Sequence, residues 1–284
     1  MNPSEVVGAL DIGGTHVTAG RVDVAARAVE SRERVRLAHA ASQAEVVAAI
    51  TGAAASSIAR DDVRRLGLAV PGPFDYASGV SRIAHKLEGL YGVDLRAELC
   101  EALHLQAENV RFLNDADAFL LGEWWAGAAR DHARVVGITL GTGLGSAFIE
   151  DGRIVAREVE LYELSFRGAP VEDTISSRGL LARYGERCDV EDVATRAAAG
   201  EDAACRAFDE LGQALGEFLL PSLQAFEPGC LVVGGSIARS WDLIRPGLLV
   251  ELRKADGLET VTVAEHLEDA PLLGAARYVA ADRA

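Results

Sequence analysis

The stretch that decides the fold is Val6-Val7-Gly8-Ala9-Leu10-Asp11-Ile12-Gly13-Gly14-Thr15, an apolar run followed at once by a glycine-rich turn. Extended character resumes over Val17 to Val22, so the turn is predicted to join two strands. The same plan returns at Val135 to Leu140, which leads into Gly141-Thr142-Gly143-Leu144-Gly145. This repetition at about half the chain length predicts two related α/β domains.

A length of 284 residues agrees with this plan, because one domain typically takes roughly 150 residues. We expect residues 1–113 to form the N-terminal domain and residues 114–273 the C-terminal one, with a terminal helix at about 274–284 packing back on the first. A break between Asn114 and Arg134 is the alternative. Within the second half, Pro221 lies inside a long helical pattern and is expected to kink or end it.

Charge and cysteine usage limit the possible partners. The chain carries 28 Lys and Arg against 43 Asp and Glu, a net charge of −15, which argues against nucleic acid or a membrane surface as a partner.

The four cysteines form no Cys-x-x-Cys pair. No apolar stretch approaches the roughly 18 residues of a membrane helix, and the polar start, Met1 to Glu5, does not resemble a signal peptide. We therefore expect a cytoplasmic globular protein.

Both glycine turns are candidate phosphate sites. Without a Cβ, backbone N–H groups can approach an anion closely, and each turn adds a threonine hydroxyl, Thr15 or Thr142. Neither turn is a Walker A loop or a dinucleotide fingerprint, because no Gly-Lys-Ser/Thr and no helix follows. The alternative is a tight hairpin that needs positive φ. The carboxylate of Asp11 is a candidate Mg²⁺ ligand, or else it caps its own turn.

A second polar cluster, Asn114-Asp115-Ala116-Asp117, follows a short strand and opens a helix. The simplest interpretation is an N-cap. The functional alternative is a carboxylate, Asp115, that accepts the proton of a hydroxyl during phosphoryl transfer. Asp117 is interpreted as a first-turn charge that favours the helix dipole.

Five segments together resemble the ROK family, which comprises sugar kinases, notably bacterial glucokinases, and repressors, within the actin-like ATPase superfamily. The resemblance runs from about Val6 to Ala276. It implies an α/β protein with two actin-like, ribonuclease H-like domains flanking a nucleotide and sugar cleft. The matching segments are Asp11-Ile12-Gly13-Gly14-Thr15, Ala69-Val70-Pro71-Gly72-Pro73, Asn114-Asp115-Ala116-Asp117-Ala118, Leu140-Gly141-Thr142-Gly143-Leu144-Gly145 and Val233-Gly234-Gly235-Ser236.

The resemblance also implies residue roles. The ATP phosphates and Mg²⁺ would be held by residues of both glycine turns, with Asp11 as the metal ligand: Asp11, Gly13, Gly14, Thr15, Gly141, Thr142 and Gly143. The adenosine would be bordered by Gly234, Gly235 and Ser236. Asn114 would bind sugar hydroxyls, Asp115 would be the general base, and Pro71 and Gly72 would line the sugar side. A homodimer is the family expectation. Since the first phosphate strand begins at Val6, we expect no N-terminal helix-turn-helix domain, which favours kinase over repressor.

One region departs from the family pattern. ROK kinases usually have Glu-x-Gly-His followed by a cysteine-rich zinc loop, whereas this chain has Glu160-Leu161-Tyr162-Glu163 and a short segment without cysteine or histidine. We therefore expect no zinc. Glu160 and Glu172 match sugar-binding glutamates, and Glu163 replaces the histidine. Solvated surface charge is the alternative for all three glutamates.

The change at Glu163 bears on the substrate. A carboxylate only accepts hydrogen bonds, whereas neutral imidazole also donates. A pocket rich in acceptors favours a ring with more donors than glucose or with a cationic amino group, so an amino sugar or a cyclitol of secondary metabolism is the alternative to a hexose. A non-catalytic sugar-binding ROK protein is the other alternative. The acceptor hydroxyl and a phosphoryl donor other than ATP stay open.

Overall fold

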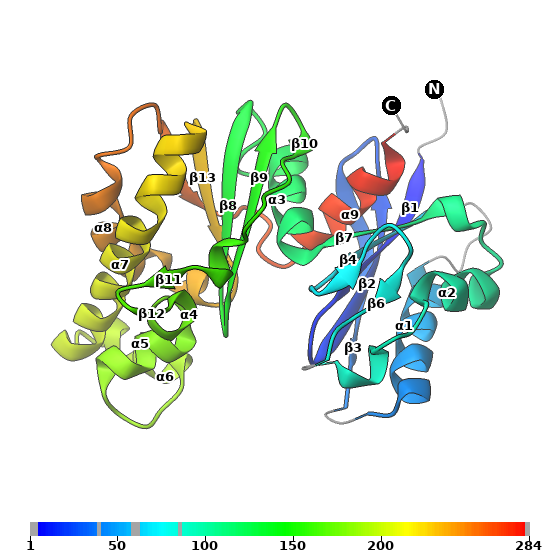
Figure 1. Cartoon of the computed structure of the whole chain (residues 1–284), viewed down its shortest axis with the longest axis horizontal. Coiled ribbons are helices and arrows are strands. Elements are labelled where there is room, and N and C mark those ends of the chain that lie inside the picture. The colour runs from blue at the N-terminus through cyan, green and yellow to red at the C-terminus, as the bar shows by residue number, and fades with distance from the viewer. Residues whose placement is uncertain (1–4, 39–40, 58–62, 85–86, 282–284) are drawn as a thin grey trace. The chain divides into compact units, whose positions relative to one another are not determined.

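The computed structural model describes residues 5–38, 41–57, 63–84 and 87–281. These residues divide into two compact units. Unit 1 comprises Met1–Arg130 and Glu268–Ala284, and unit 2 comprises Asp131–Leu267. Each unit is built around its own mixed five-stranded sheet (Figure 1).

The sheet of unit 1 has the order β3-β2-β1-β4-β7. Its β1–β2 and β2–β3 pairs are antiparallel, and its β1–β4 and β4–β7 pairs are parallel. The buried runs of β1 and β4 explain why these two strands are central. The strands are β1 (Val6–Ile12), β2 (His16–Asp23), β3 (Ala28–Arg36), β4 (Leu66–Val70) and β7 (Val110–Asn114), with a small hairpin of β5 (Phe74–Asp75) and β6 (Val80–Ser81).

Helices complete unit 1, and α9, which is the last helix in the chain, packs against β1, β4 and α3. Gly122 of α3 and Gly274 of α9 allow the two helices to cross closely, since a Cβ at Gly274 would lie 1.8 Å from the carbonyl oxygen of Ala118. This contact keeps α3 in unit 1. The helical elements are α1 (Gln43–Ser57), η1 (Glu88–Leu90), α2 (Leu95–Leu103), η2 (Ala107–Asn109), α3 (Asp115–Ala126) and α9 (Ala270–Ala280).

Unit 1 thus extends to Arg130, beyond the break expected before Asn114 and within the alternative range from Asn114 to Arg134. The physical reason is the apolar character of α3 on most of its sides: Phe119, Leu120 and Leu121 are all buried. A helix of this kind has to be covered by the unit in which it begins.

The sheet of unit 2 has the order β10-β9-β8-β13-β14. The pairs β8–β9 and β9–β10 are antiparallel, and β8–β13 and β13–β14 are parallel. This is the arrangement of unit 1 repeated, as the recurring strand and glycine-turn plan predicts, and it confirms the actin-like α/β fold. The strands are β8 (Arg134–Leu140), β9 (Leu144–Glu150), β10 (Arg153–Ile154), β13 (Cys230–Gly234) and β14 (Thr260–Val263).

The remaining elements of unit 2 are mostly helical and cover its sheet. The two longest helices, α7 and α8, pack on one another (Figure 1). These elements are η3 (Leu161–Glu163), β11 (Ser165–Phe166), β12 (Ala169–Pro170), α4 (Val171–Thr174), α5 (Ser177–Tyr184), α6 (Val190–Ala198), α7 (Asp202–Phe226), η4 (Ile237–Ser240) and α8 (Trp241–Leu252).

Of the two alternatives for Pro221, a kink or an end of the helix, the end is wrong, because α7 continues through Pro221 to Phe226. Leu219 and Leu223, on either side of the proline, are buried in the core of unit 2. Burial of these side chains outweighs the hydrogen bond that proline cannot donate.

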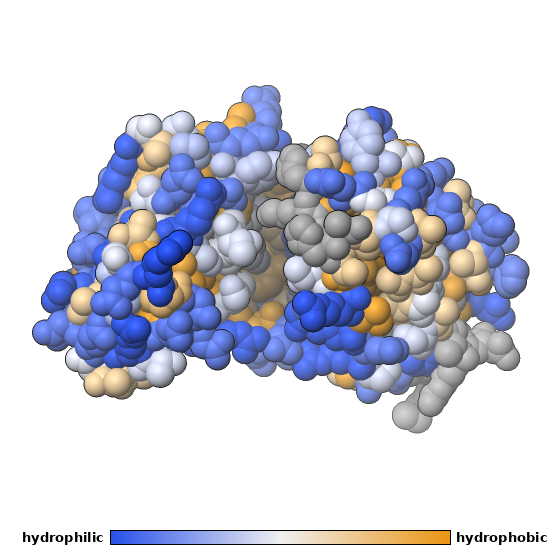
Figure 2. Space-filling view, turned by 90° about the horizontal axis from the view of Figure 1, so that it is seen from below, coloured by the Kyte–Doolittle hydropathy of each residue, from blue (hydrophilic) through white to orange (hydrophobic). Residues whose placement is uncertain are grey.

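The apolar residues of the chain fill two separate cores, one in each unit. Hydrophilic residues cover most of the face seen in Figure 2, with hydrophobic ones scattered among them. Within the described residues, none of the helices combines the length and the apolar character that crossing a membrane requires.

Candidate active site

Unit 1 brings its predicted site residues to one edge of its sheet. The neighbouring strands β1, β4 and β7 are parallel, so their carboxyl ends meet at the same edge. Asp11 pairs in register with Ala69, and Val70 pairs with Asn114. The end of β1, the Pro71-Gly72 segment after β4 and the Asn114-Asp115 pair after β7 therefore lie side by side.

Asp11 has a strongly perturbed carboxyl group. Burial, followed by the nearby charge of Asp115, raises its pKa from 3.8 to about 7, although Arg34 acts in the opposite direction. A buried carboxylate with a second negative charge nearby is suited to a divalent cation, which would stabilise the ionised form. Asp11 thus fits the Mg²⁺ that the family resemblance implies.

The raised pKa of Asp11 predicts a pH-dependent stability. Between about pH 4 and pH 7 the folded chain keeps a proton that the unfolded chain has lost, so this group stabilises the fold at low pH and the contribution is lost as the pH rises through 7. We expect Asp11→Asn to be more stable than the wild type at pH 8, by up to about 4 kcal/mol, and to match it near pH 4. Urea unfolding at both pH values measures this, and an equal difference at the two would contradict it.

Asn114 caps α3, as its position before the helix predicts. Its Oδ1 accepts hydrogen bonds from the backbone N–H groups of Ala116 (2.9 Å) and Asp117 (3.4 Å). Its Nδ2 donates to the hydroxyl of Tyr76 at 3.2 Å, and that hydroxyl donates to the carbonyl of Val70 at 3.1 Å. The capping interpretation is confirmed, and the side chain is fixed at both ends.

Tyr76 is a residue that the sequence reasoning missed. It is far from Asn114 in the chain and belongs to no recognisable motif. The turn after β5 places its hydroxyl beside the Pro71-Gly72 segment, where a Cβ on Gly72 would lie 3.7 Å away. Nothing in the spacing of the sequence could have signalled this contact.

The first glycine turn, Gly13-Gly14-Thr15, is open to a ligand. Gly13 donates its N–H to the carbonyl of His16 at 2.8 Å, and Gly14 and Thr15 are exposed. Neither Gly13 nor Gly14 has a positive φ, and the same holds for Gly141 and Gly143 in the second turn. The alternative of a hairpin that needs positive φ is therefore wrong for both turns, and close approach to the backbone is the remaining reason for glycine.

In unit 2 the second glycine turn lies beside the end of β13, because β8 and β13 are parallel neighbours with Thr139 opposite Gly234. The carbonyl of Gly141 accepts from the N–H (2.8 Å) and the hydroxyl (2.9 Å) of Ser177. Gly235 has φ +85°, and a Cβ there would lie 2.3 Å from the carbonyl oxygen of Leu140. Only glycine fits this position, so the two segments are held close together.

Glu172 lies directly against the second turn. Its Oε1 accepts the N–H of Leu144 at 2.9 Å and occupies the space in which a Cβ of Gly143 would stand, 2.3 Å from it. Arg178 is near its other oxygen at 4.0 Å. Glu172 therefore contacts the predicted phosphate turn, although the family resemblance implied a sugar contact.

Glu160 precedes the short η3 helix, and Glu163 is the last residue of that helix. Burial raises the pKa of Glu160, Arg157 lowers it and Glu163 raises it. Burial also raises the pKa of Tyr162, and the charges of Glu163, Glu160 and Glu172 add to this effect. The charges of all three predicted glutamates thus act on Tyr162, a residue that was given no role from the sequence and whose side chain is 46% exposed.

The described parts of the chain contain no group of three or more histidine, cysteine or acidic residues arranged to hold a metal ion. This observation concerns metal sites in which protein side chains supply all of the ligands. A magnesium ion that also bonds to nucleotide phosphates needs only one or two carboxylates from the protein.

Comparisons with known proteins agree with the motifs. A glucokinase of Thermotoga maritima is 24% identical over 95% of this chain and 96% of its own length. An N-acetyl-D-glucosamine kinase of Aliivibrio fischeri is 27% identical over 86% of this chain and 88% of its own. The crystal structure of a ROK hexokinase from Thermus thermophilus superposes with a TM-score of 0.78 at 26% identity, covering 95% of this chain and 96% of that one.

The family model described as "ROK family" matches residues 7–157 and 166–282. The interruption, residues 158–165, covers the Glu160-Leu161-Tyr162-Glu163 stretch and only the start of the short segment that follows it, in the region where this chain departs from the family pattern. The match covers nearly the whole of both units, and the chain belongs to the ROK family.

Proposed function

We propose that this chain is a sugar kinase that transfers the γ-phosphoryl group of ATP to a hydroxyl of a hexose or a sugar-like polyol. The observation that carries the proposal is the common edge of β1, β4 and β7, which brings Asp11, Pro71-Gly72 and Asn114-Asp115 together. Relatives named glucokinase and N-acetyl-D-glucosamine kinase support the same class of reaction.

Asp115 is proposed as the general base. Its carboxylate stands at the first turn of α3, where Oδ1 accepts the N–H of Ala116 at 2.9 Å. We propose that the carboxylate takes the proton of the acceptor hydroxyl. Asn114 is proposed to bind a neighbouring sugar hydroxyl, because Tyr76 and the helix N-terminus fix the amide. A fixed hydrogen-bond partner orients the acceptor without a further entropy cost.

The glycine turns are proposed to bind the phosphates of ATP. The N–H groups of Gly13 and Gly141 donate within their own turns, to the carbonyls of His16 and Gly143, so the other backbone N–H groups, together with Thr15 and Thr142, are proposed as donors to the charge on the transferring group. Asp11 would hold Mg²⁺, which when bound neutralises phosphate charge. Gly234, Gly235 and Ser236, next to the second turn, are proposed to border the adenosine. A cytoplasmic homodimer is proposed on the family resemblance alone.

The decisive experiment is an ATP-consumption assay with a panel of hexoses, amino sugars and cyclitols. We expect ADP to form in the presence of at least one acceptor and only slowly without any. If calorimetry detects binding of a sugar while none of the panel raises ADP formation, the chain is a sugar-binding protein and the kinase proposal is rejected.

A second candidate is a kinase for an amino sugar or a cyclitol. The specific observation is that the charges of Glu160, Glu163 and Glu172 all act on Tyr162. Carboxylates attract a cationic amino group and accept hydrogen bonds from hydroxyls, and Glu163 is exposed while Glu160 and Glu172 are half-buried. A glucose kcat/KM far above those of glucosamine and of cyclitols would reject this candidate.

Glu163→Gln tests the contribution of this carboxylate. If a substrate amino group pairs with Glu163, the ratio of kcat/KM for glucosamine to that for glucose should fall by about tenfold, the size of one hydrogen bond to a charged group. The exposed Glu259, in the same unit but outside the cluster, provides a matched control, and Glu259→Gln should leave the ratio unchanged. An equal effect of both substitutions would indicate a general charge effect.

A further inference from the structure

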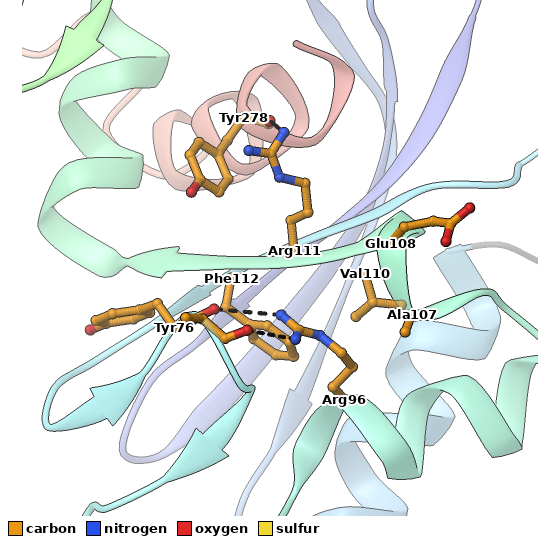
Figure 3. Close-up of a pocket in the computed structure, with 9 residues that line it drawn as sticks. Tyr76, Arg96, Ala107, Glu108, Val110, Arg111, Phe112 and Tyr278 are labelled. Carbon is orange, nitrogen blue, oxygen red and sulfur yellow. Dashed lines mark hydrogen bonds between the residues drawn. The ribbon is translucent and has the colours of Figure 1, made fainter. Parts of the chain in front are cut away.

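Unit 1 contains a cavity of about 320 Å³ away from the glycine turns (Figure 3). Residues of α2, β7 and α9 and the turn after β5 form its walls. This volume is sufficient for a small organic ligand. The residues that matter for its chemistry are Tyr76, Arg96, Glu108, Arg111, Phe112 and Tyr278.

Two guanidinium groups line this cavity, and both donate only to backbone carbonyls. Arg96 donates to Ala77 at 2.6 Å and to Tyr76 at 3.5 Å, and Arg111 donates to Tyr278 at 2.8 Å and to Ala281 at 3.2 Å. Each cation also lies over an aromatic ring, Arg96 at 5.4 Å from that of Phe112 and Arg111 at 4.3 Å from that of Tyr278. The two guanidiniums are therefore held in fixed positions.

Within the part of the chain that the structure describes, neither Arg96 nor Arg111 has an acidic group within ion-pair distance, whereas other arginines, for example Arg21 and Arg32, do. Glu108 lines the cavity, but its carboxylate points away from both guanidiniums. In a chain with net charge −15, two such cations at one cavity are unusual.

Arg96 also has a donor without an acceptor. Its Nε is buried and has no hydrogen-bond partner. A buried N–H of a charged group carries a desolvation cost that an acceptor would relieve. Guanidinium groups match the oxygens of phosphate in geometry and charge. The buried Nε itself is not accessible from the cavity, but the two guanidinium groups that line the cavity suit an oxyanion.

We propose that this cavity binds a small organic phosphate monoester. The two guanidiniums balance the two negative charges of the phosphate, and the organic part lies against the rings of Phe112 and Tyr278. The site is separate from the sugar and ATP residues proposed above, so it does not depend on the kinase proposal.

Tyr76 connects this site to the proposed acceptor site. Tyr76 is one of the lining residues, and its carbonyl accepts from Arg96. Its ring extends away from the two guanidiniums (Figure 3), and its hydroxyl contacts the Nδ2 of Asn114 and the carbonyl of Val70. An occupant that moves the tyrosine therefore changes how the Asn114 amide is held. The bound phosphate monoester is an effector that shifts KM for the sugar, and this second step rests on the proposed function.

Calorimetry with the full chain tests the binding step, with glycerol 3-phosphate as the probe and glycerol as its neutral counterpart. We expect glycerol 3-phosphate to bind and glycerol not to bind. Arg96→Gln and Arg111→Gln should each raise its dissociation constant at least tenfold. The matched control is Arg27→Gln, because Arg27 also donates to a backbone carbonyl, that of Trp125, and lies over a ring, outside the cavity.

Thermal melting verifies that each variant is folded, and Arg111→Lys serves as a second variant that keeps the charge but loses the forked geometry. No binding of glycerol 3-phosphate to the wild type at millimolar concentration overturns the site, whether or not the chain is a kinase. A second outcome also overturns the proposed cavity site: glycerol 3-phosphate binds, but ATP displaces it and the arginine substitutions do not weaken its binding. In that case the ligand is bound at the glycine turns.

Steady-state kinetics with a sugar that the protein phosphorylates test whether Tyr76 connects the cavity to the acceptor site. Glycerol 3-phosphate should change KM for the sugar at least threefold in the wild type. In Tyr76→Phe, which keeps the ring and loses the hydroxyl, it should bind within twofold of the wild-type affinity without changing KM. If saturating glycerol 3-phosphate leaves the KM of the wild type for the sugar unchanged, the connection between the cavity and the acceptor site through Tyr76 is rejected. The conclusion that the cavity binds glycerol 3-phosphate is not affected by this outcome.

Discussion

Asp115→Asn should lower kcat by about a thousandfold and leave the dissociation constant of ATP within about twofold. A positioned general base contributes about 10² to 10⁴ in rate, and the amide of asparagine cannot take the proton of the acceptor hydroxyl. The backbone contact of residue 115 with Ala116 is compatible with asparagine, so the start of α3 is preserved. Steady-state kinetics with the best acceptor, together with calorimetric titration of ATP, measure both quantities.

Asp117→Asn is the matched control for this prediction. Asp117 lies in the same first turn of α3 and carries the same charge, so its substitution causes the same loss of helix-dipole stabilisation, about 0.3–1 kcal/mol. We expect its kcat to stay within about threefold of the wild type. Near-normal turnover in Asp115→Asn, or an equal loss in both variants, would remove Asp115 from the role of general base.

Gly274→Ala should destabilise the chain by about 3 kcal/mol, although alanine is the better helix former. The added Cβ would stand 1.8 Å from the carbonyl oxygen of Ala118, so α3 and α9 have to move apart. Backbone atoms cannot rotate away as a side chain can, and forced separation of packed helices has a cost of this order. Urea unfolding monitored by circular dichroism measures the change.

Gly52→Ala provides the contrast. Gly52 lies within α1, and a Cβ there would have no atom within 4 Å. Alanine should therefore stabilise the helix by up to about 1 kcal/mol. If Gly274→Ala costs less than about 1 kcal/mol, or if both substitutions have the same sign, the close crossing of α3 and α9 does not limit stability in the way described.

The sequence was sufficient for the plan of the fold because local signals agreed with one another. Apolar runs that stop at glycine turns predicted β1 and β8 and the duplicated sheets. The side chain of Asp94, a residue type that favours N-cap positions, accepts the N–H of Ala97 at the start of α2. The positions of Asp11 and Asn114 at one sheet edge follow from the same plan, since the carboxyl ends of parallel strands meet.

What the sequence could not provide depends on packing between distant segments. The course of α7 through Pro221 is decided by burial of its neighbours, and the assignment of α3 to unit 1 by its contact with α9. The contact of Tyr76 with Asn114 and the action of the Glu172 charge on Tyr162 join residues on separate segments of the chain. Local propensity contains no information on such contacts.

The discontinuity of unit 1 has a consequence for synthesis of the chain on the ribosome. Helix α9 packs so closely on β4 that a Cβ on Gly67 would lie 2.1 Å from the carbonyl oxygen of Ala275. This helix emerges only after all of unit 2 has been translated. All residues of unit 2 are therefore available for folding before α9 is, and the N-terminal part of unit 1 keeps this face of its sheet uncovered until α9 has emerged.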